Sequence, residues 1–190
     1  MKNSTNDQSI SFSAENVNRI VFNPPRPQIN DEIKYTAALK LAKDNPELNE
    51  ELSPEEIATI IVEIAADCCS RDGYYLATEL DDVYMWDIDA HSVEILDNYD
   101  HLVNAELKKV QKEWVKTNNI QPPFSIGTKV TFKWCYEEHI GVIDKISEFD
   151  PAFYLIKTDL KTESKTITYV RKAFEDCWLA ENNEGAQNYE

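Results

Sequence analysis

The spacing of apolar residues changes along the chain, and this change predicts helices followed by strands. From Asn30 to about residue 121, apolar positions recur at intervals of three and four residues, the period of an amphipathic helix. After Pro123 they alternate with polar positions every second residue, the period of a half-buried strand. The pattern therefore predicts an α+β protein with an N-terminal helical region and a C-terminal five-stranded small barrel.

The helical region shows one strong start signal and several weaker ones. Ser53-Pro54-Glu55-Glu56 is a capping box with proline at the first helical position. Its apolar stripe continues to Cys68, and Asp72-Gly73 is expected to close the helix. A further helix is predicted from Asn30 to before Pro46, a short one from Tyr74 to about Asp82, and a longer one from an N-cap at Asp89, whose pattern allows a break near Asp97-Asn98.

Five short strands are predicted between residues 124 and 180, with bends at Gly127 and Gly141. The run Ile126-Gly127-Thr128-Lys129-Val130 is followed by Gly141-Val142-Ile143, Tyr154-Leu155-Ile156 and Thr168-Tyr169-Val170. In strand spacing and glycine placement, this segment resembles an SH3-like small barrel of the Tudor or KOW kind. The resemblance implies a fold and a habit of binding proteins or nucleic acids, and it implies no reaction.

Four regions follow from these patterns. Residues 1–30 are expected to form a leader or arm that either docks or stays loose, because Pro24, Pro25 and Pro27 interrupt its apolar alternation. Residues 31–121 form an acidic helical domain, residues 124–180 the barrel, and residues 181–190 a polar, flexible tail.

Charge is distributed very unevenly along the chain. Its net charge is −16, and the stretch from Asp44 to Glu106 holds 18 acidic residues against one basic residue, Arg71. The other 127 residues carry a net charge of +1. From Phe124 onward, twelve acidic residues outnumber eight basic ones, so the predicted barrel has no strong nucleic-acid footprint. An acidic region of this kind repels nucleic acid and membrane surfaces and favours basic partners.

Several function classes receive no support from the motifs. The polar N-terminus does not resemble a secretory signal, no apolar run is long enough for a membrane span, and the four cysteines lack a CxxC spacing, so a cytoplasmic protein with reduced thiols is expected. No nucleotide-binding loop, dinucleotide fingerprint or GxSxG turn occurs. Asp87 and Asp89 fit the start of a calcium loop, but Ser92 stands where that loop requires glycine. No metal or cofactor is therefore expected.

The candidate partner-binding residues combine acidic and aromatic side chains. The aromatics Tyr84 and Trp86 interleave with the acids; they either fill the core or lie exposed as a surface for an Arg- or Lys-rich partner. The candidate residues are Glu79, Asp81, Asp82, Asp87, Asp89, Glu94, Asp97, Asp100, Tyr84 and Trp86.

The leading hypothesis is a non-enzymatic acidic protein that acts as a DNA mimic, with carboxylates occupying the basic surface of a nucleic-acid-binding protein. By charge alone, the chain is similar to the acidic anti-restriction and anti-CRISPR inhibitors of phages and mobile elements. Three alternatives stay open: acidity that serves solubility only, an adaptor whose barrel binds a protein or peptide, and a hydrolase or metal-dependent enzyme. Direct binding to nucleic acid or membrane is not expected, and the oligomeric state is left open.

Overall fold

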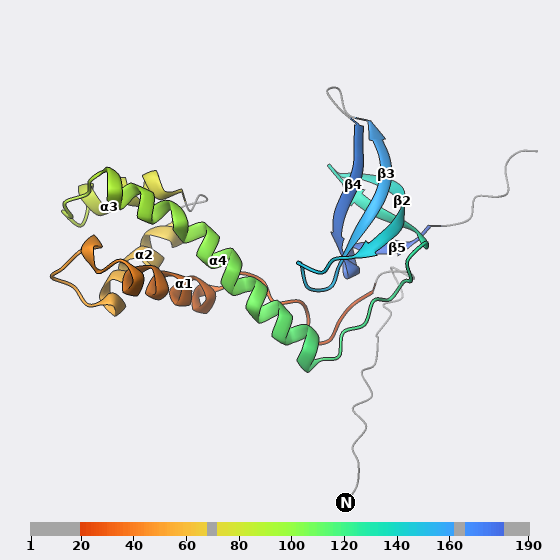
Figure 1. Ribbon diagram of the computed structural model, residues 1–190, viewed down its shortest axis with the longest axis horizontal. Coiled ribbons are helices and arrows are strands. Elements are labelled where there is room, and N and C mark those ends of the chain that lie inside the picture. The colour runs from red at the N-terminus through yellow and green to blue at the C-terminus, as the bar shows by residue number, and fades with distance from the viewer. Residues whose placement is uncertain (1–19, 68–71, 162–165, 181–190) are drawn as a thin grey trace, which may run out of the picture. The chain divides into compact units, whose positions relative to one another are not determined.

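In the part of the chain that the structure describes, four α-helices are followed by a five-stranded antiparallel sheet (Figure 1). The computed structural model describes residues 20–67, 72–161 and 166–180. The expected α+β order, with helices before strands, is confirmed. The chain divides into two compact units: residues 27–111 form the helical unit, and residues up to 26 together with those from 112 onward form the sheet unit. The helical unit is therefore inserted into the sequence of the sheet unit.

The helical unit is built around an aliphatic core. Ile57, Ile61, Leu76, Leu80 and Leu96 are almost completely buried in it, as the helical spacing predicts. The elements, of which the last extends into the sheet unit, are α1 (Asp31–Asp44), the short 3₁₀ helix η1 (Pro46–Leu48), α2 (Pro54–Asp67), α3 (Gly73–Asp82) and α4 (Ala90–Thr117).

The capping box of α2 forms as predicted. The Ser53 hydroxyl accepts a hydrogen bond from the Glu56 N–H at 3.3 Å, and the Glu56 carboxylate accepts one from the Ser53 N–H at 2.9 Å. These bonds satisfy N–H groups that have no partner within the helix. Hydrogen bonding from Ser53 also holds the pKa of Glu56 below its usual value.

One expectation about a helix end is wrong, and a break that the pattern allowed in the last helix does not occur. Asp72-Gly73 begins α3 rather than closing the preceding helix, because the Asp72 carboxylate accepts the Tyr74 N–H at 2.8 Å and so acts as the N-cap of α3. In addition, α4 continues without a break through Asp97 and Asn98. The Asn98 amide donates to the carbonyl of Glu94 at 3.0 Å, so this turn former is satisfied within the helix. The expected extension of α2 to Cys68 lies outside the described residues.

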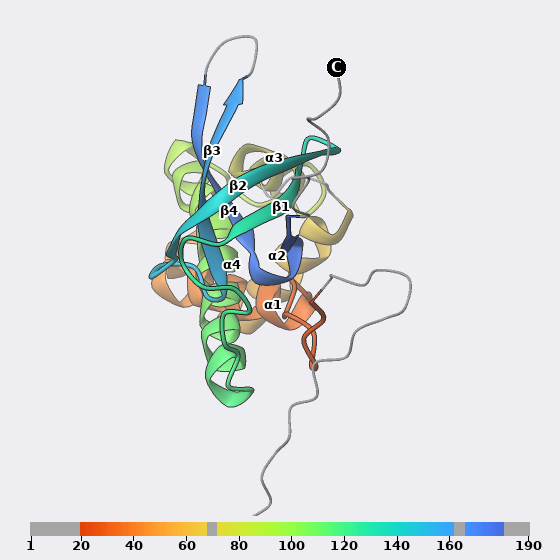
Figure 2. The same cartoon turned by 90° about the vertical axis from the view of Figure 1, so that its right-hand side faces the viewer.

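The sheet is an antiparallel meander whose last strand returns to the first (Figure 2). The strand order is β4-β3-β2-β1-β5. Register shifts interrupt the β2–β3 and β3–β4 pairings. Gly141 lies inside β2 and pairs with Val130, whereas Gly127 has the positive φ of a turn, +88°. The strands are β1 (Lys129–Trp134), β2 (Glu137–Ile146), β3 (Phe153–Lys161), β4 (Thr166–Ala173) and β5 (Cys177–Leu179), with the 3₁₀ helix η2 (Phe174–Asp176) before β5.

Tyr154 connects the sheet to the segment that precedes it. Its side chain is fully buried, and its hydroxyl accepts a hydrogen bond from the Phe124 N–H at 2.8 Å while donating one to the Phe124 carbonyl at 2.9 Å. Burial raises the pKa of Tyr154 to about 12. A single phenol therefore satisfies two backbone groups of the connection between α4 and β1.

Residues 20–26 dock on the sheet unit. The sequence had left open whether this part of the leader docks or stays loose. Ile20 is buried, and the Phe22 ring packs edge-on against Trp114 with 5.7 Å between ring centroids. The indole N–H of Trp114 donates to the Pro24 carbonyl at 3.0 Å. Residues 1–19 of the expected leader and the expected tail at 181–190 lie outside the described part of the chain.

Arg26 fastens this N-terminal segment. Its guanidinium donates to the carbonyls of Pro151 and Ala152, each at 2.7 Å, and pairs with the Glu175 carboxylate through two nitrogens. The side chain is only 6% exposed and also lies over the Trp114 ring, 5.2 Å from its centroid. A buried guanidinium with this many partners locks residues that are distant in sequence.

Candidate acidic interaction surface

The end of α3, the turn after it and the start of α4 follow one another along the chain, and a contact of His91 places η1 next to the start of α4. His91, in the first turn of α4, lies 3.8 Å from a carboxylate oxygen of Glu47 and 3.9 Å from one of Glu94. We call this region the acidic end; its carboxylates are Glu47, Asp81, Asp82, Asp87, Asp89 and Glu94. Sequence reasoning missed Glu47, because it lies far upstream and only the tertiary fold brings it to α4.

Net charge differs sharply between the two units. The helical unit contains 20 acidic and 6 basic residues, for a net charge of −14, whereas the sheet unit has a net charge of −2. Most of these carboxylates lie on helices that pack around the core, and the others lie in the turns between them. Ordered charges of one sign create a stronger local potential than the same charges on a disordered tail.

Three carboxylates at the acidic end are exposed and are not neutralised. Within the residues that the structure describes, Asp81, Asp82 and Asp87 are exposed and form no ion pair with lysine or arginine. Asp81 and Asp82 also occupy the last turn of α3, where the helix dipole disfavours negative charge. Local helix stability therefore does not explain their placement.

The turn after α3 exposes apolar side chains between these carboxylates. Val83 is 61% exposed and Met85 is 82% exposed. Met85 has a left-handed backbone, with φ of +57°, and its N–H donates to the Asp81 carbonyl at 3.1 Å. The next N–H, that of Trp86, donates to the Leu80 carbonyl at 3.0 Å. The turn is thus held by hydrogen bonds in a conformation that non-glycine residues seldom adopt, and it presents Met85 to solvent.

Trp86 is the anchor of this turn and not part of the accessible surface. Only 5% of it is exposed, and it belongs to the aliphatic core of the helical unit. The expected partner-binding role of the Trp86 ring is therefore corrected to a packing role. Tyr84 is half-buried, and its hydroxyl lies 3.5 Å from a Glu63 carboxylate oxygen.

Four other candidates hold the fold or lie partly buried. Asp89 caps α4 by accepting hydrogen bonds from the Ser92 N–H at 2.8 Å and the Ser92 hydroxyl at 2.9 Å, which lower the pKa of Asp89. Asp97 accepts the Gly73 N–H at 3.1 Å and so fixes the start of α3 against α4. Asp100 is half-buried and accepts the Asn104 amide at 2.7 Å. Glu79 is half-buried.

Metal, membrane and family signals add nothing to this surface. Among the described residues, no group of three His, Cys, Asp or Glu side chains is placed to hold a metal ion. Over the same residues, no helix is both long enough and apolar enough to cross a membrane. Comparisons with family models, curated proteins and solved structures found no match to the chain. The surface is therefore interpreted from its own geometry.

Proposed function

We propose that the protein is a non-enzymatic interaction protein whose acidic end occupies the basic surface of a nucleic-acid-binding protein, in the manner of a DNA mimic. One observation carries the proposal: Asp81, Asp82 and Asp87 are exposed, have no lysine or arginine partner among the residues that the structure describes, and flank the exposed Val83 and Met85 in sequence. Such a mixture suits a protein interface, in which apolar contacts are desolvated and charges orient the partner.

Solubility alone is a weaker explanation of this arrangement. Charges that serve only solubility have no reason to collect at the unfavourable end of a helix or around exposed apolar residues. A cleft that binds phosphates gains affinity by releasing counterions, and an array of carboxylates provides the same salt-dependent contribution. The acidic end is thus similar to DNA in its negative charge, and it differs from DNA in the exposed apolar side chains of Val83 and Met85.

The proposal extends to the sheet unit and to the place of action. We infer that the five strands form an SH3-like small barrel; in support, β5 returns to β1 after η2, and the sheet contains two irregular registers that increase its curvature. In this proposal the barrel carries the helical unit as an insertion. The protein acts in the cytoplasm, where nucleic-acid-binding enzymes work.

The proposal is tested by capture and displacement. The full chain is immobilised and exposed at low salt to a nuclease-treated lysate of its native host, and bound proteins are eluted with duplex DNA. We expect a nucleic-acid-binding protein that DNA displaces, with affinity falling at least about tenfold between about 50 and 200 mM salt. A captured protein that resists both duplex DNA and salt would contradict the mimic, as would the absence of any protein that DNA displaces.

A further inference from the structure

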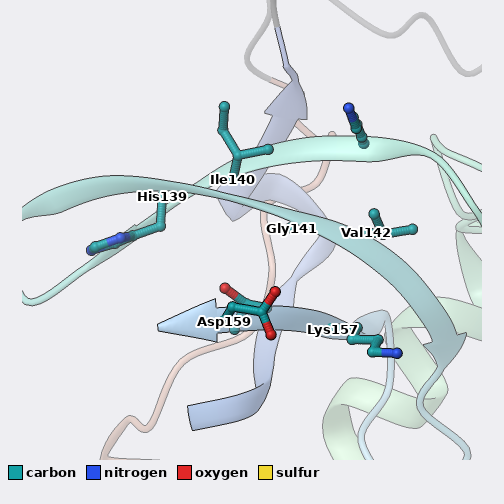
Figure 3. A pocket seen from close by; sticks show the side chains of 8 residues that line it. His139, Ile140, Gly141, Val142, Lys157 and Asp159 are labelled. Atoms are coloured by element: carbon teal, nitrogen blue, oxygen red, sulfur yellow. The ribbon is translucent and has the colours of Figure 1, made fainter. Parts of the chain in front are cut away.

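A shallow groove crosses the exposed face of the sheet at the centre of β2 (Figure 3). Its volume is about 340 Å³, and it lies on the sheet unit, apart from the acidic residues discussed above. Both charged and apolar side chains line it, from β1, β2 and β3. The lining residues are Lys129, His139, Ile140, Gly141, Val142, Lys157, Thr158 and Asp159.

Strand pairing places two lysines on opposite sides of an apolar floor. Lys129 pairs with Val142 across β1 and β2, and Val142 pairs with Lys157 across β2 and β3. Two strand spacings separate the lysine backbones by about 10 Å. Both lysines are exposed, while Val142 is 37% exposed and the neighbouring Ile140 is 58% exposed. The groove therefore offers two cations with aliphatic surface between them.

Gly141 keeps this floor in place. A side chain at this position would point toward β3, and its Cβ would come within 2.7 Å of the Lys157 carbonyl oxygen, which is closer than real Cβ atoms approach backbone. The absence of a side chain lets β2 and β3 lie close together at the groove. Ile156, behind the floor, is completely buried, so the floor rests on packed core and is fixed before a ligand arrives.

We propose that this groove binds an extended acidic peptide segment of a second partner protein. Carboxylates of the peptide would pair with Lys129 and Lys157, and an aliphatic side chain between them would cover Val142 and Ile140. The proposal does not depend on the acidic end, because it concerns a different unit and a ligand of opposite charge. Taken together with the proposed function, on which this last step rests, it makes the protein a connector between a basic and an acidic partner.

The groove favours a peptide over nucleic acid as its ligand. A phosphate backbone needs a continuous row of cations, but exposed Asp159 stands two residues from Lys157 on β3 and breaks such a row. Figure 3 shows both side chains on the same stretch of β3 below Val142. An aliphatic floor suits an aliphatic side chain better than a stacked base, which prefers an aromatic platform.

The test uses a fluorescein-labelled peptide, Gly-Asp-Glu-Leu-Glu-Asp-Gly, added to the ¹⁵N-labelled full chain. Anisotropy gives the affinity, and amide shifts give the site. We expect the shifts to centre on Lys129, Val142 and Lys157. Replacing the peptide's acids by Asn and Gln, or its Leu by Ser, should weaken binding at least about threefold, because each change removes one of the two recognition elements.

A pair of matched variants distinguishes the groove from general charge. Lys129→Gln with Lys157→Gln should weaken the peptide about five- to tenfold, whereas Lys133→Gln with Lys145→Gln, which removes the same charge from exposed positions outside the groove, should change affinity less than about twofold. Equal losses for both pairs, shifts centred elsewhere, or no binding by the peptide would overturn the proposal. Tighter binding of a short oligo(dT) strand at the same amides would assign the groove to nucleic acid and overturn it as well.

Discussion

The helical unit and the sheet unit differ in their net charge and in how their cores are assembled. The helical unit carries nearly all the net charge, −14, on a core of aliphatic side chains from four neighbouring helices. The sheet unit is almost neutral, and its core is completed by segments far apart in sequence, including residues 20–26 and the last turn of α4. A locally built apolar core leaves the surface free to vary in charge. A core built from distant segments depends instead on specific polar contacts such as those of Arg26.

Among the variants that distinguish the two units, we expect the largest loss of stability from replacing Arg26. Arg26→Ala should lower the free energy of unfolding of the sheet unit by about 3–5 kcal/mol, because it leaves Glu175 and two backbone carbonyls without their buried partner. Hydrogen exchange of β3 and α2 amides would separate the two units, and α2 should retain its protection. Arg26→Lys should cost less, since it keeps the charge but loses the paired geometry. A loss below about 1 kcal/mol for Arg26→Ala would contradict the role of this contact.

Two glycines, one in each unit, allow a matched comparison. A Cβ at Gly141 would meet the backbone of β3, and a Cβ at Gly73 would come within 2.7 Å of the Asp97 Cα. Each Gly→Ala variant should lower stability by about 1–3 kcal/mol, and each in its own unit only. Gly127→Ala serves as a control, because nothing lies near its Cβ and only its positive φ is strained. Thermal unfolding with hydrogen exchange measures all three. If either variant lowered the stability of both units equally, the expectation that each glycine supports only its own unit would be contradicted.

Tyr154 makes the stability of the sheet unit depend on pH in the alkaline range. Unfolded tyrosine ionises near pH 10, whereas the pKa of Tyr154 is raised to about 12. The contribution of Tyr154 is therefore complete below pH 10 and is lost as the pH rises toward 12. Burial also raises the pKa of Cys177 from 9.0 to about 12. The stability of the sheet unit therefore begins to fall near pH 9, where the unfolded thiol starts to ionise. Tyr154→Phe should cost about 1–3 kcal/mol at neutral pH through Phe124 and should flatten the decline above pH 10 in denaturant titrations. An unchanged alkaline decline would contradict this assignment.

The smallest effect concerns charge repulsion within the helical unit. Neutralising Asp81 and Asp82 as Asn should raise its stability by a few tenths of a kcal/mol each at low salt, because both lie at the negative end of α3. Added salt should stabilise wild type more than the double variant, and the sheet unit should respond little. Hydrogen exchange at two salt concentrations measures this difference. A clear loss of stability would show that these carboxylates hold the fold and do not serve a partner.

The sequence predicted element types well and contacts between elements poorly. Ser53 and the strand alternation from Val130 mark their elements by local chemistry, so they could be identified from the sequence. The role of Asp72-Gly73 was wrong, because a cap and a terminator use the same residue types and the contact with Asp97 decides between them. Glu47 and the groove escaped prediction for a similar reason. Both depend on residues that only tertiary packing or strand register brings together.

The acidic end itself was predicted in charge but not in composition. Asp81, Asp82 and Asp87 were expected at the surface and lie there, and Trp86, for which the sequence left both core and surface open, lies in the core. Alternation of aromatics with acids cannot tell which ring packs inward, since that depends on the turn geometry at Met85. The exposed pair Val83 and Met85 was not anticipated, because apolar residues next to a helix are usually assigned to its core.

The central claim is that these particular carboxylates, and not net charge alone, bind a basic partner. The most direct measurement compares two triple variants against the partner that DNA displaces, by titration calorimetry at low salt. Asp81→Asn, Asp82→Asn and Asp87→Asn together should weaken binding at least about tenfold. Asp31→Asn, Glu32→Gln and Glu106→Gln, which remove the same charge at positions away from the acidic end, should weaken it less than about threefold. Equal losses for the two sets, or full binding by the first, would contradict the account.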